Sequence, residues 1–362
     1  MYDLFLDSAE SETPRMRGER SFDENEAYQI QTYDSKVSNC VLNYEHQYGR
    51  WLSTSHQDSG QNHRKVLWSP LCFYLSGRHI KENMGKVDAL EKLLSEYPVD
   101  AEVFCTYEPK ADGTRRPIVK PNKPLNKWLK EVKRALYQQR KDWPTFLHGG
   151  VKKRSYVSFA RPHTNKKTVI AIDIHNCFGS ITQKEVQTAL MSKLGMSDGL
   201  ASRLAVKLCY KHRIPQGFAT SSFLTNLCLN DTLLHINRQM RRRQIDMTIY
   251  VDDIALSAQK INSAEIINLV SLELSRARLA ISKAKVKVMH AHKPQIICGL
   301  IVNKGVALTR QKRTDLFSDI AKGSMSEASL QGWLANLNMI DKKTMTKLKD
   351  YAIQKGLIKV GA

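Results

Sequence analysis

The segment IYVDDIAL (Ile249–Leu256) decides the fold, because apolar residues lead into two adjacent carboxylates and resume directly after them. This pattern predicts two short strands joined by a tight turn that carries the acids at its tip. Neighbouring like charges repel each other, so they are costly at such a tip unless a cation neutralises them. A hard divalent ion such as Mg²⁺ binds carboxylate oxygens. The sequence therefore predicts a cation at this turn.

A third acid stands at the end of another apolar segment. Residues 168–174 (TVIAIDI) are apolar apart from Thr168 and Asp173, which is typical of a buried central strand. Phosphoryl transfer by two metal ions uses carboxylates that hold the ions roughly 3.5–4 Å apart. Asp173, Asp252 and Asp253 can supply such a set. Each motif alone also fits an ordinary turn or a strand cap, but both together in one basic chain favour a metal site.

The charge distribution points to a polyanionic partner. The 362 residues contain 56 Lys and Arg against 35 Asp and Glu, a formal net charge of +21. Residues 1–62 hold eleven acidic and five basic residues, a net charge of −6, which leaves +27 for the remainder. Nucleic acid is the first candidate for the partner, and a merely soluble basic surface is the alternative.

The cysteines and the N-terminus indicate the compartment. Seven cysteines stand singly without a Cys-x-x-Cys pair, as expected for buried thiols in a reducing cytosol. The N-terminus has no basic region followed by an apolar run. No apolar run approaches the roughly 20 residues that a membrane span needs. We therefore expect a cytoplasmic protein that does not contact a membrane.

Turn and cap signals divide the rest of the chain. The acidic segment 1–62 fits either a flexible arm or an extension that docks a partner. A strand pair is predicted around residues 111–113. Helices are predicted from Pro124, Thr182 and Leu200, and a long helix is predicted to open within the small residues 219–222. From Lys312 onward the pattern indicates a small module of amphipathic helices.

Three further patterns concern the basic and C-terminal segments. Residues 148–155 (HGGVKKRS) form a glycine-broken basic loop, which fits either close approach to phosphate or an ordinary exposed loop. Lys283, Lys285 and Lys287 alternate, which predicts one strand with all three on one face. Residues 296–302 and 306–308 predict a hairpin around Asn303.

The order of these parts resembles a reverse transcriptase. The motifs that carry the likeness are, in chain order, Asp173-x-x-x-x-Phe178, Pro215-Gln216-Gly217 with Ser221-Ser222, Tyr250-Val251-Asp252-Asp253, the lysine-rich segment, and Cys298 to Asn303. Together they span the chain from about Arg115 to Asn303, more than half its length.

The likeness extends to the retron type and to related defence-associated enzymes of bacteria. Residues 159–163 (FARPH) are similar to the retron Asn-Ala-x-x-His signature, with Phe159 in place of the Asn. Cys298-Gly299 stands where retron enzymes usually read Val-Thr-Gly. Val251 replaces the Ala that is more common in their Tyr-Ala-Asp-Asp motif. These departures affect the retron assignment more than the polymerase assignment.

The resemblance implies an α+β right-hand polymerase. Its expected parts are an acidic N-terminal extension (1–62), fingers with part of the palm (63–167), a ferredoxin-like palm (168–310) and a helical thumb (311–362).

The resemblance also implies roles for single residues. Asp173, Asp252 and Asp253 correspond to the catalytic carboxylates, which hold two Mg²⁺ (or Mn²⁺) together with the backbone carbonyl of Ile174. A nucleotide site is also implied, in which Arg116 binds the triphosphate and Phe178 excludes the ribose 2′-hydroxyl. Gln216 and Gly217 would contact the nucleotide and the template, and Lys285 would lie near the leaving pyrophosphate. Contacts to nucleic acid are expected at Lys152, Lys153, Arg154 and Tyr250.

The function expected from this likeness is RNA-directed DNA polymerisation, with a dedicated non-coding RNA copied into DNA during anti-phage defence. The expected partners are RNA template and primer, the RNA–DNA hybrid, dNTPs, and an effector protein or a second copy of the chain. Two alternatives stay open. One is another lineage of reverse transcriptase, either intron-like or template-independent, although the intron type usually carries a C-terminal His/Cys-rich nuclease. The other is a catalytically silent RNA-binding scaffold, which would have no use for three clustered acids.

Overall fold

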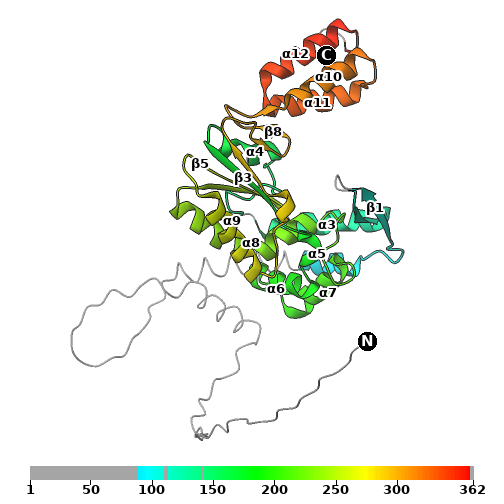
Figure 1. Ribbon diagram of the computed structural model, residues 1–362. Coiled ribbons are helices and arrows are strands. Elements are labelled where there is room, and N and C mark those ends of the chain that lie inside the picture. The colour runs from blue at the N-terminus through cyan, green and yellow to red at the C-terminus, as the bar shows by residue number, and fades with distance from the viewer. Residues whose placement is uncertain (1–87, 110–112, 141, 359–362) are drawn as a thin grey trace, which may run out of the picture. The chain divides into compact units, whose positions relative to one another are not determined.

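The computed structural model describes residues 88–109, 113–140 and 142–358 (Figure 1). Every described element belongs to the unit that spans residues 65–362. The acidic extension expected at residues 1–62 lies outside the described residues, as do Cys40 and Cys72.

A four-stranded antiparallel sheet forms the centre of this unit. Its strands are β3 (Thr168–Asp173), β4 (Asp246–Tyr250), β5 (Asp253–Ala258) and β6 (Lys287–His290), in the spatial order β4-β5-β3-β6. Helices connect β3 to β4 and β5 to β6, which gives the βαββαβ order of a ferredoxin-like fold. The palm architecture expected from the sequence is therefore confirmed.

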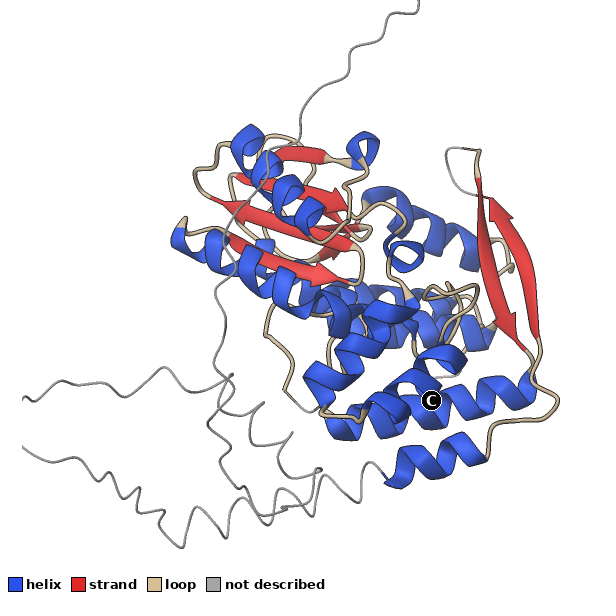
Figure 2. Cartoon of the chain, turned by 90° about the horizontal axis from the view of Figure 1, so that it is seen from below, coloured by secondary structure: helices blue, strands red, loops and turns tan. Residues whose placement is uncertain are grey.

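Both faces of this sheet are covered, which explains why β3 is almost wholly apolar. Ile170 and Ile172 pack in the larger core with α8 (Ser221–Arg242) and α9 (Ser263–Arg276). Val169, which points the other way, packs in a second core with residues of α4 (Tyr156–Ala160) and of the C-terminal helices. Figure 2 shows helices layered against the sheet. A strand that is buried on both faces reads as a continuous apolar run.

The strand pair β1–β2 and several helices form where local signals predict them. β1 (Val103–Pro109) pairs with β2 (Arg115–Pro121), and α3 (Lys123–Gln139) starts with proline in its first turn. Thr182 and Glu185 form a reciprocal capping box at the start of α6 (Gln183–Leu194). The remaining elements are η1 (Arg161–His163), α5 (Cys177–Ser180) and α7 (Asp198–Leu208).

The predicted lysine strand is wrong. Lys283 and Lys285 lie in a 3₁₀ turn, η2 (Lys283–Lys285), and only Lys287 belongs to β6. The cause is a tertiary contact, because the amide of Ser282 donates to the carbonyl of Asp173 and its hydroxyl donates to the Asp173 carboxylate. These two bonds fix the segment at the end of β3, so regular pairing with β3 begins two residues after η2.

The predicted hairpin around Asn303 is right in part. β8 (Leu300–Ile301) and β9 (Ala307–Leu308) pair across it, but residues 296–302 do not form one strand. A turn at Cys298 and Gly299, both with positive φ, separates β8 from β7 (Ile296–Ile297). The segment therefore forms a three-stranded sheet.

The C-terminal module is helical, as predicted. It consists of α10 (Arg310–Ala321), α11 (Glu327–Ile340) and α12 (Lys342–Gln354). Leu316, Leu330 and Leu348, one from each helix, are buried in the same core as Val169. Within the described ranges, no helix is both long and apolar enough to cross a bilayer.

Candidate active site

Three carboxylates meet at one end of the sheet. β3 and β5 pair so that Asp173 lies directly opposite Asp253, and Asp252 occupies the two-residue turn between β4 and β5. Residues directly opposite each other in an antiparallel pair have Cβ atoms about 4.5–5.5 Å apart. The turn is also bonded to the end of β3, since the Ile174 amide donates to the Asp252 carbonyl over 2.9 Å. Acids from two distant segments are thus brought together.

Burial and mutual repulsion alter the protonation of these acids. Desolvation raises the pKa of Asp252 to about 6, and the charges of Asp253 and Asp173 add to this effect. Desolvation, followed by the charge of Asp173, also raises the pKa of Asp253. The folded protein therefore holds negative charge here at a cost in free energy, which a bound cation would reduce.

Lys285 places a positive charge beside this cluster. Its ammonium donates to Oδ1 of Asp173 over 2.8 Å, while the Ser282 hydroxyl donates to Oδ2 over 2.6 Å. The bond to Asp173 raises the pKa of Lys285. Sequence reasoning placed Lys285 in the site but missed Ser282, because no local pattern marks a serine that contacts a residue 109 positions earlier.

The donor set suits a hard divalent cation in its chemistry, since three partly buried carboxylates offer several oxygen ligands. Among the described residues, no group of three or more His, Cys, Asp or Glu side chains is already arranged as a metal site. Both oxygens of Asp173 are bonded, one to Ser282 and one to Lys285. A cation that binds Asp173 must therefore share these oxygens with Ser282 and Lys285 or displace these two partners.

The turn expected to contact the nucleotide lies against β2. The Val119 amide donates to the Gln216 carbonyl over 2.8 Å. Gly217 has φ +129°, and a Cβ atom there would lie 2.3 Å from the Val119 carbonyl oxygen, so only glycine fits. Arg116 is on the same strand, exposed, and paired with Glu108 at 3.0 Å. The fold thus brings Gln216 and Gly217 to the strand that carries Arg116.

Two aromatic residues of the expected site are partly buried. Phe178, on α5, packs against the larger core and follows Asp173 by five residues. Tyr250, the last residue of β4, has its ring centroid 5.7 Å from that of Phe159, the residue that replaces the Asn of the retron signature.

His163 of the same signature is fully buried between Ser257 and Thr248, and desolvation lowers its pKa to about 3.

The basic loop divides into exposed and interior parts. Lys152 and Lys153 are exposed, and the Lys152 ammonium lies 5.2 Å from the centre of the Tyr137 ring. Arg154 is half-buried, and its guanidinium donates to three backbone carbonyls, those of Trp143, Pro144 and Leu147. Arg154 thus ties the loop to the segment that precedes it, residues 143–147.

One thiol lies next to the acids. Sγ of Cys298 lies 3.6 Å from Oδ2 of Asp253. Desolvation, together with the charge of Asp253, raises the pKa of Cys298 to about 12, so the thiol is protonated at neutral pH and donates to the carboxylate. The retron-like turn drew attention to this residue, but no local pattern places it beside Asp253.

Replacing Lys285 by Gln is expected to destabilise the metal-free protein, because Asp173 then lacks its positive partner beside two other acids. We expect the midpoint of thermal unfolding in EDTA to fall by about 2–4 °C. Millimolar Mg²⁺ should recover most of this loss, which dye-based thermal scans with and without Mg²⁺ would measure. The matched control is Lys283→Gln in the same turn. Equal shifts for both variants would contradict a specific role of Lys285.

Comparison with known proteins agrees with the motifs. The family profile "Reverse transcriptase (RNA-dependent DNA polymerase)" matches residues 108–315. The retron Se72 reverse transcriptase of Salmonella heidelberg is 29% identical over 206 residues, covering 55% of this chain and 54% of that protein. The retron Ec48 reverse transcriptase of Escherichia coli is 29% identical over 226 residues, covering 59% and 55%. The chain thus spans about half the length of these curated relatives.

A solved structure, telomerase from Candida albicans in complex with a TWJ fragment of telomeric RNA, aligns with a TM-score of 0.43 at 11% identity, covering 74% of this chain and 62% of that chain.

The family profile covers more than half of the chain and includes every residue of the acidic cluster. The retron relatives match the type of enzyme that the motifs around Phe159 and Cys298 resemble. The protein is therefore a member of the reverse transcriptase family, and it is similar to reverse transcriptases of the retron type.

Proposed function

We propose that this protein is an RNA-directed DNA polymerase that copies a dedicated non-coding RNA into DNA as part of anti-phage defence. The observation that carries the catalytic part is the placement of Asp173 opposite Asp253, with Asp252 in the adjoining turn. Three partly buried carboxylates, two of which have raised pKa values, have a clear use in phosphoryl transfer and none in passive RNA binding.

In this proposal Asp173, Asp252 and Asp253, with the Ile174 carbonyl, hold two Mg²⁺. The bound ions would lower the pKa of the primer hydroxyl and neutralise charge on the triphosphate. Arg116 binds the triphosphate, since a guanidinium offers planar paired donors that stay charged at any working pH. To do so, Arg116 exchanges its exposed partner Glu108 for phosphate.

Gln216 and Gly217 place the nucleotide between β2 and the carboxylates. Lys285, released from Asp173, carries its charge to the leaving pyrophosphate and can donate a proton to it. Lys152, Lys153 and Tyr250 contact nucleic acid, with the net charge of +27 outside residues 1–62 attracting the backbone. Because phosphate contacts dominate such binding, activity should fall as salt rises.

The similarity to retron reverse transcriptases supports a dedicated RNA as template and, more indirectly, the defence role. The expected fingers, palm and thumb boundaries (63–167, 168–310 and 311–362) belong to the same proposal, as does a further partner, either an effector protein or a second copy of the chain.

The experiment that tests the proposal is primer extension on an RNA template with Mg²⁺ and dNTPs, run with wild type and with Asp252→Ala. Extension by wild type alone supports the polymerase. If neither protein extends the primer but both still bind RNA, the protein is a catalytically silent RNA-binding scaffold instead. Sequencing the RNA that co-purifies with the protein separates a dedicated RNA (one dominant species) from a lineage that uses many templates.

Replacing Phe178 by Ala is expected to relax the choice of sugar. In the proposal its ring occupies the space that a ribose 2′-hydroxyl would need, so the smaller side chain admits ribonucleotides. We expect the ratio of kcat/KM for dNTP over rNTP to fall by roughly 10²-fold. Single-nucleotide incorporation with matched dNTP and rNTP would measure it. An unchanged ratio would make Phe178 a packing residue only.

A further inference from the structure

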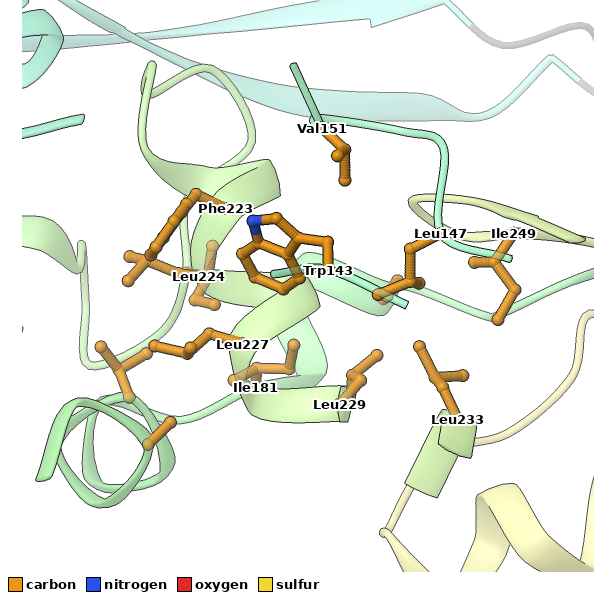
Figure 3. Packing of buried hydrophobic residues seen from close by; sticks show 14 of the residues in the cluster. Trp143, Leu147, Val151, Ile181, Phe223, Leu224, Leu227, Leu229, Leu233 and Ile249 are labelled. Carbon is orange, nitrogen blue, oxygen red and sulfur yellow. The ribbon is translucent and has the colours of Figure 1, made fainter. Parts of the chain in front are cut away.

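Residues 146–149 extend the sheet beyond β4, which is its edge strand. Leu147 forms a parallel bridge with Ile249, and Figure 3 shows the two side chains next to each other. The Ile249 amide donates to the Phe146 carbonyl over 2.8 Å, and the His148 amide donates to the Ile249 carbonyl over 2.7 Å. This segment therefore pairs with the strand that leads directly into the turn of Asp252.

Gly149 lies against that turn without room for a side chain. A Cβ atom on Gly149 would lie 2.5 Å from the amide nitrogen and from Cγ2 of Val251, and 2.8 Å from the carbonyl carbon of Tyr250. Two of these three atoms are backbone, so a rotamer change cannot relieve the contact. Any residue larger than glycine must displace either the loop or the catalytic turn.

The turn itself needs such support. Val251 has φ +62°, a conformation that is rare for a β-branched residue and usually taken by glycine at the first position of a two-residue hairpin turn. A strained conformation of this kind persists only when its surroundings determine it. Gly149 packs directly on Val251, the residue before Asp252.

The loop that carries Gly149 is anchored at both ends. Arg154 holds it through the three carbonyls named above. From the other side, the Asn226 amide group on α8 donates to the Gly149 carbonyl over 2.7 Å, and Gly150 packs against Ser222 near the start of the same helix. Asn226 is buried, so this bond is shielded from water. α8 directly follows the segment of Gln216 and Gly217, so the loop connects the nucleotide side to the acids.

We infer that Gly149 is a positioning residue: the loop 146–150, fixed by Arg154 and Asn226, sets the place of Asp252 through its contact with Val251. This gives the glycine-broken basic loop a use other than phosphate contact. The inference rests on the proposed polymerase function, because the property it explains is the placement of a catalytic carboxylate.

The test is Gly149→Ala, with Gly199→Ala as the matched control, because a Cβ on Gly199 would meet nothing within 4 Å. Displacing a catalytic group by about 1 Å costs roughly 10²-fold in rate. We expect kcat for primer extension to fall by about that factor in Gly149→Ala, with KM for dNTP within about threefold of wild type, and more Mg²⁺ to be needed for half-maximal rate. Gly199→Ala should match wild type. A wild-type kcat for soluble, folded Gly149→Ala would overturn the inference.

Arg154→Lys provides a second variant in case Gly149→Ala does not fold. Lysine keeps the positive charge for phosphate but cannot bond three carbonyls at once. Positioning predicts a lower kcat with an unchanged dependence of RNA affinity on salt. A wild-type kcat, with or without a shallower salt dependence, would overturn it.

The rise in unfolding temperature on adding Mg²⁺ gives a readout without turnover. It should be smaller in Gly149→Ala and Arg154→Lys than in wild type and Gly199→Ala. If wild type shows no extension, the proposed function fails, and this thermal readout alone decides the positioning: equal rises in all four proteins overturn it.

Discussion

Replacing Asp252 by Asn is expected to abolish nucleotide addition while leaving the fold intact. Asn keeps the size of the side chain but removes the charge that the proposed ions require. Loss of a group that stabilises charge in the transition state costs about 10²–10³-fold, and the loss here should reach or exceed the upper value because a metal ligand is removed as well. Primer extension under single-turnover conditions measures it. Activity within tenfold of wild type would contradict the assignment of the site.

The same substitution is expected to stabilise the metal-free protein at neutral pH. The pKa of Asp252 in the folded state is about 6, above the usual range of a carboxyl group. The folded state thus favours the protonated form of Asp252. The protonated carboxyl therefore stabilises the folded protein below about pH 4, and this stabilisation is lost as pH rises through 6. At pH 7.5 the ionised group costs on the order of 3 kcal/mol, a cost that the neutral amide does not have.

Thermal unfolding in EDTA tests whether Asp252→Asn raises or lowers the stability of the metal-free protein. At pH 7.5 the Asn variant should unfold a few degrees above wild type, and near pH 4 the two should coincide. Mg²⁺ should stabilise wild type and have little effect on the variant. Asp350→Asn, at an exposed position of α12, is the control and should show no difference at either pH. A variant less stable than wild type at pH 7.5 would show that the three acids do not repel one another as described.

Replacing Gly217 by Ala is expected to disable the nucleotide side of the site. The new Cβ would lie 2.3 Å from the Val119 carbonyl oxygen, and φ +129° is strained for any residue except glycine. Because the Val119 amide bonds the Gln216 carbonyl, either β2 or the turn must move. We expect kcat/KM for dNTP to fall by roughly 10²-fold through misplacement of the nucleotide relative to the acids. Steady-state kinetics with varied dNTP measures it.

The variant Gly195→Ala separates the effect of backbone strain at positive φ from the effect of the steric clash with Val119. Gly195 also has positive φ, at the end of α6, but a Cβ there would meet nothing within 4 Å. This control should lose about 1 kcal/mol of stability and keep its kinetics. If the kinetic constants of the two variants fall equally, the close approach to Val119 has no role in the reaction.

Much of the site could be predicted because its signals are local. The strands on either side of Asp252 and the apolar strand ending at Asp173 follow from side-chain alternation and from burial on both faces. The start of α6 follows from the Thr182–Glu185 capping box, which involves residues three apart. Signals of this range are complete within a short window of sequence.

The errors arose where long-range contacts override such signals. The lysine alternation at residues 283–287 reads as a strand, but the bonds from Ser282 to Asp173 turn the chain there instead. Arg154 is a separate case: in a basic loop it reads as a phosphate ligand, its guanidinium donates to three nearby backbone carbonyls, and its contact with nucleic acid stays a prediction. A guanidinium bonds either group equally well, so composition cannot decide between them.

The three acids, the strands that carry them and the family to which the chain belongs can be read from the amino-acid sequence, because periodicity and short motifs are encoded within a few residues. The groups that surround the acids became known only from the folded chain: Lys285 and Ser282 contact Asp173, Cys298 lies beside Asp253, and Gly149 packs against the turn of Asp252. Hydrogen bonds and close packing depend on differences of a few tenths of an ångström in the distances between atoms. These atoms belong to segments more than 40 residues apart, and no local pattern encodes their separation.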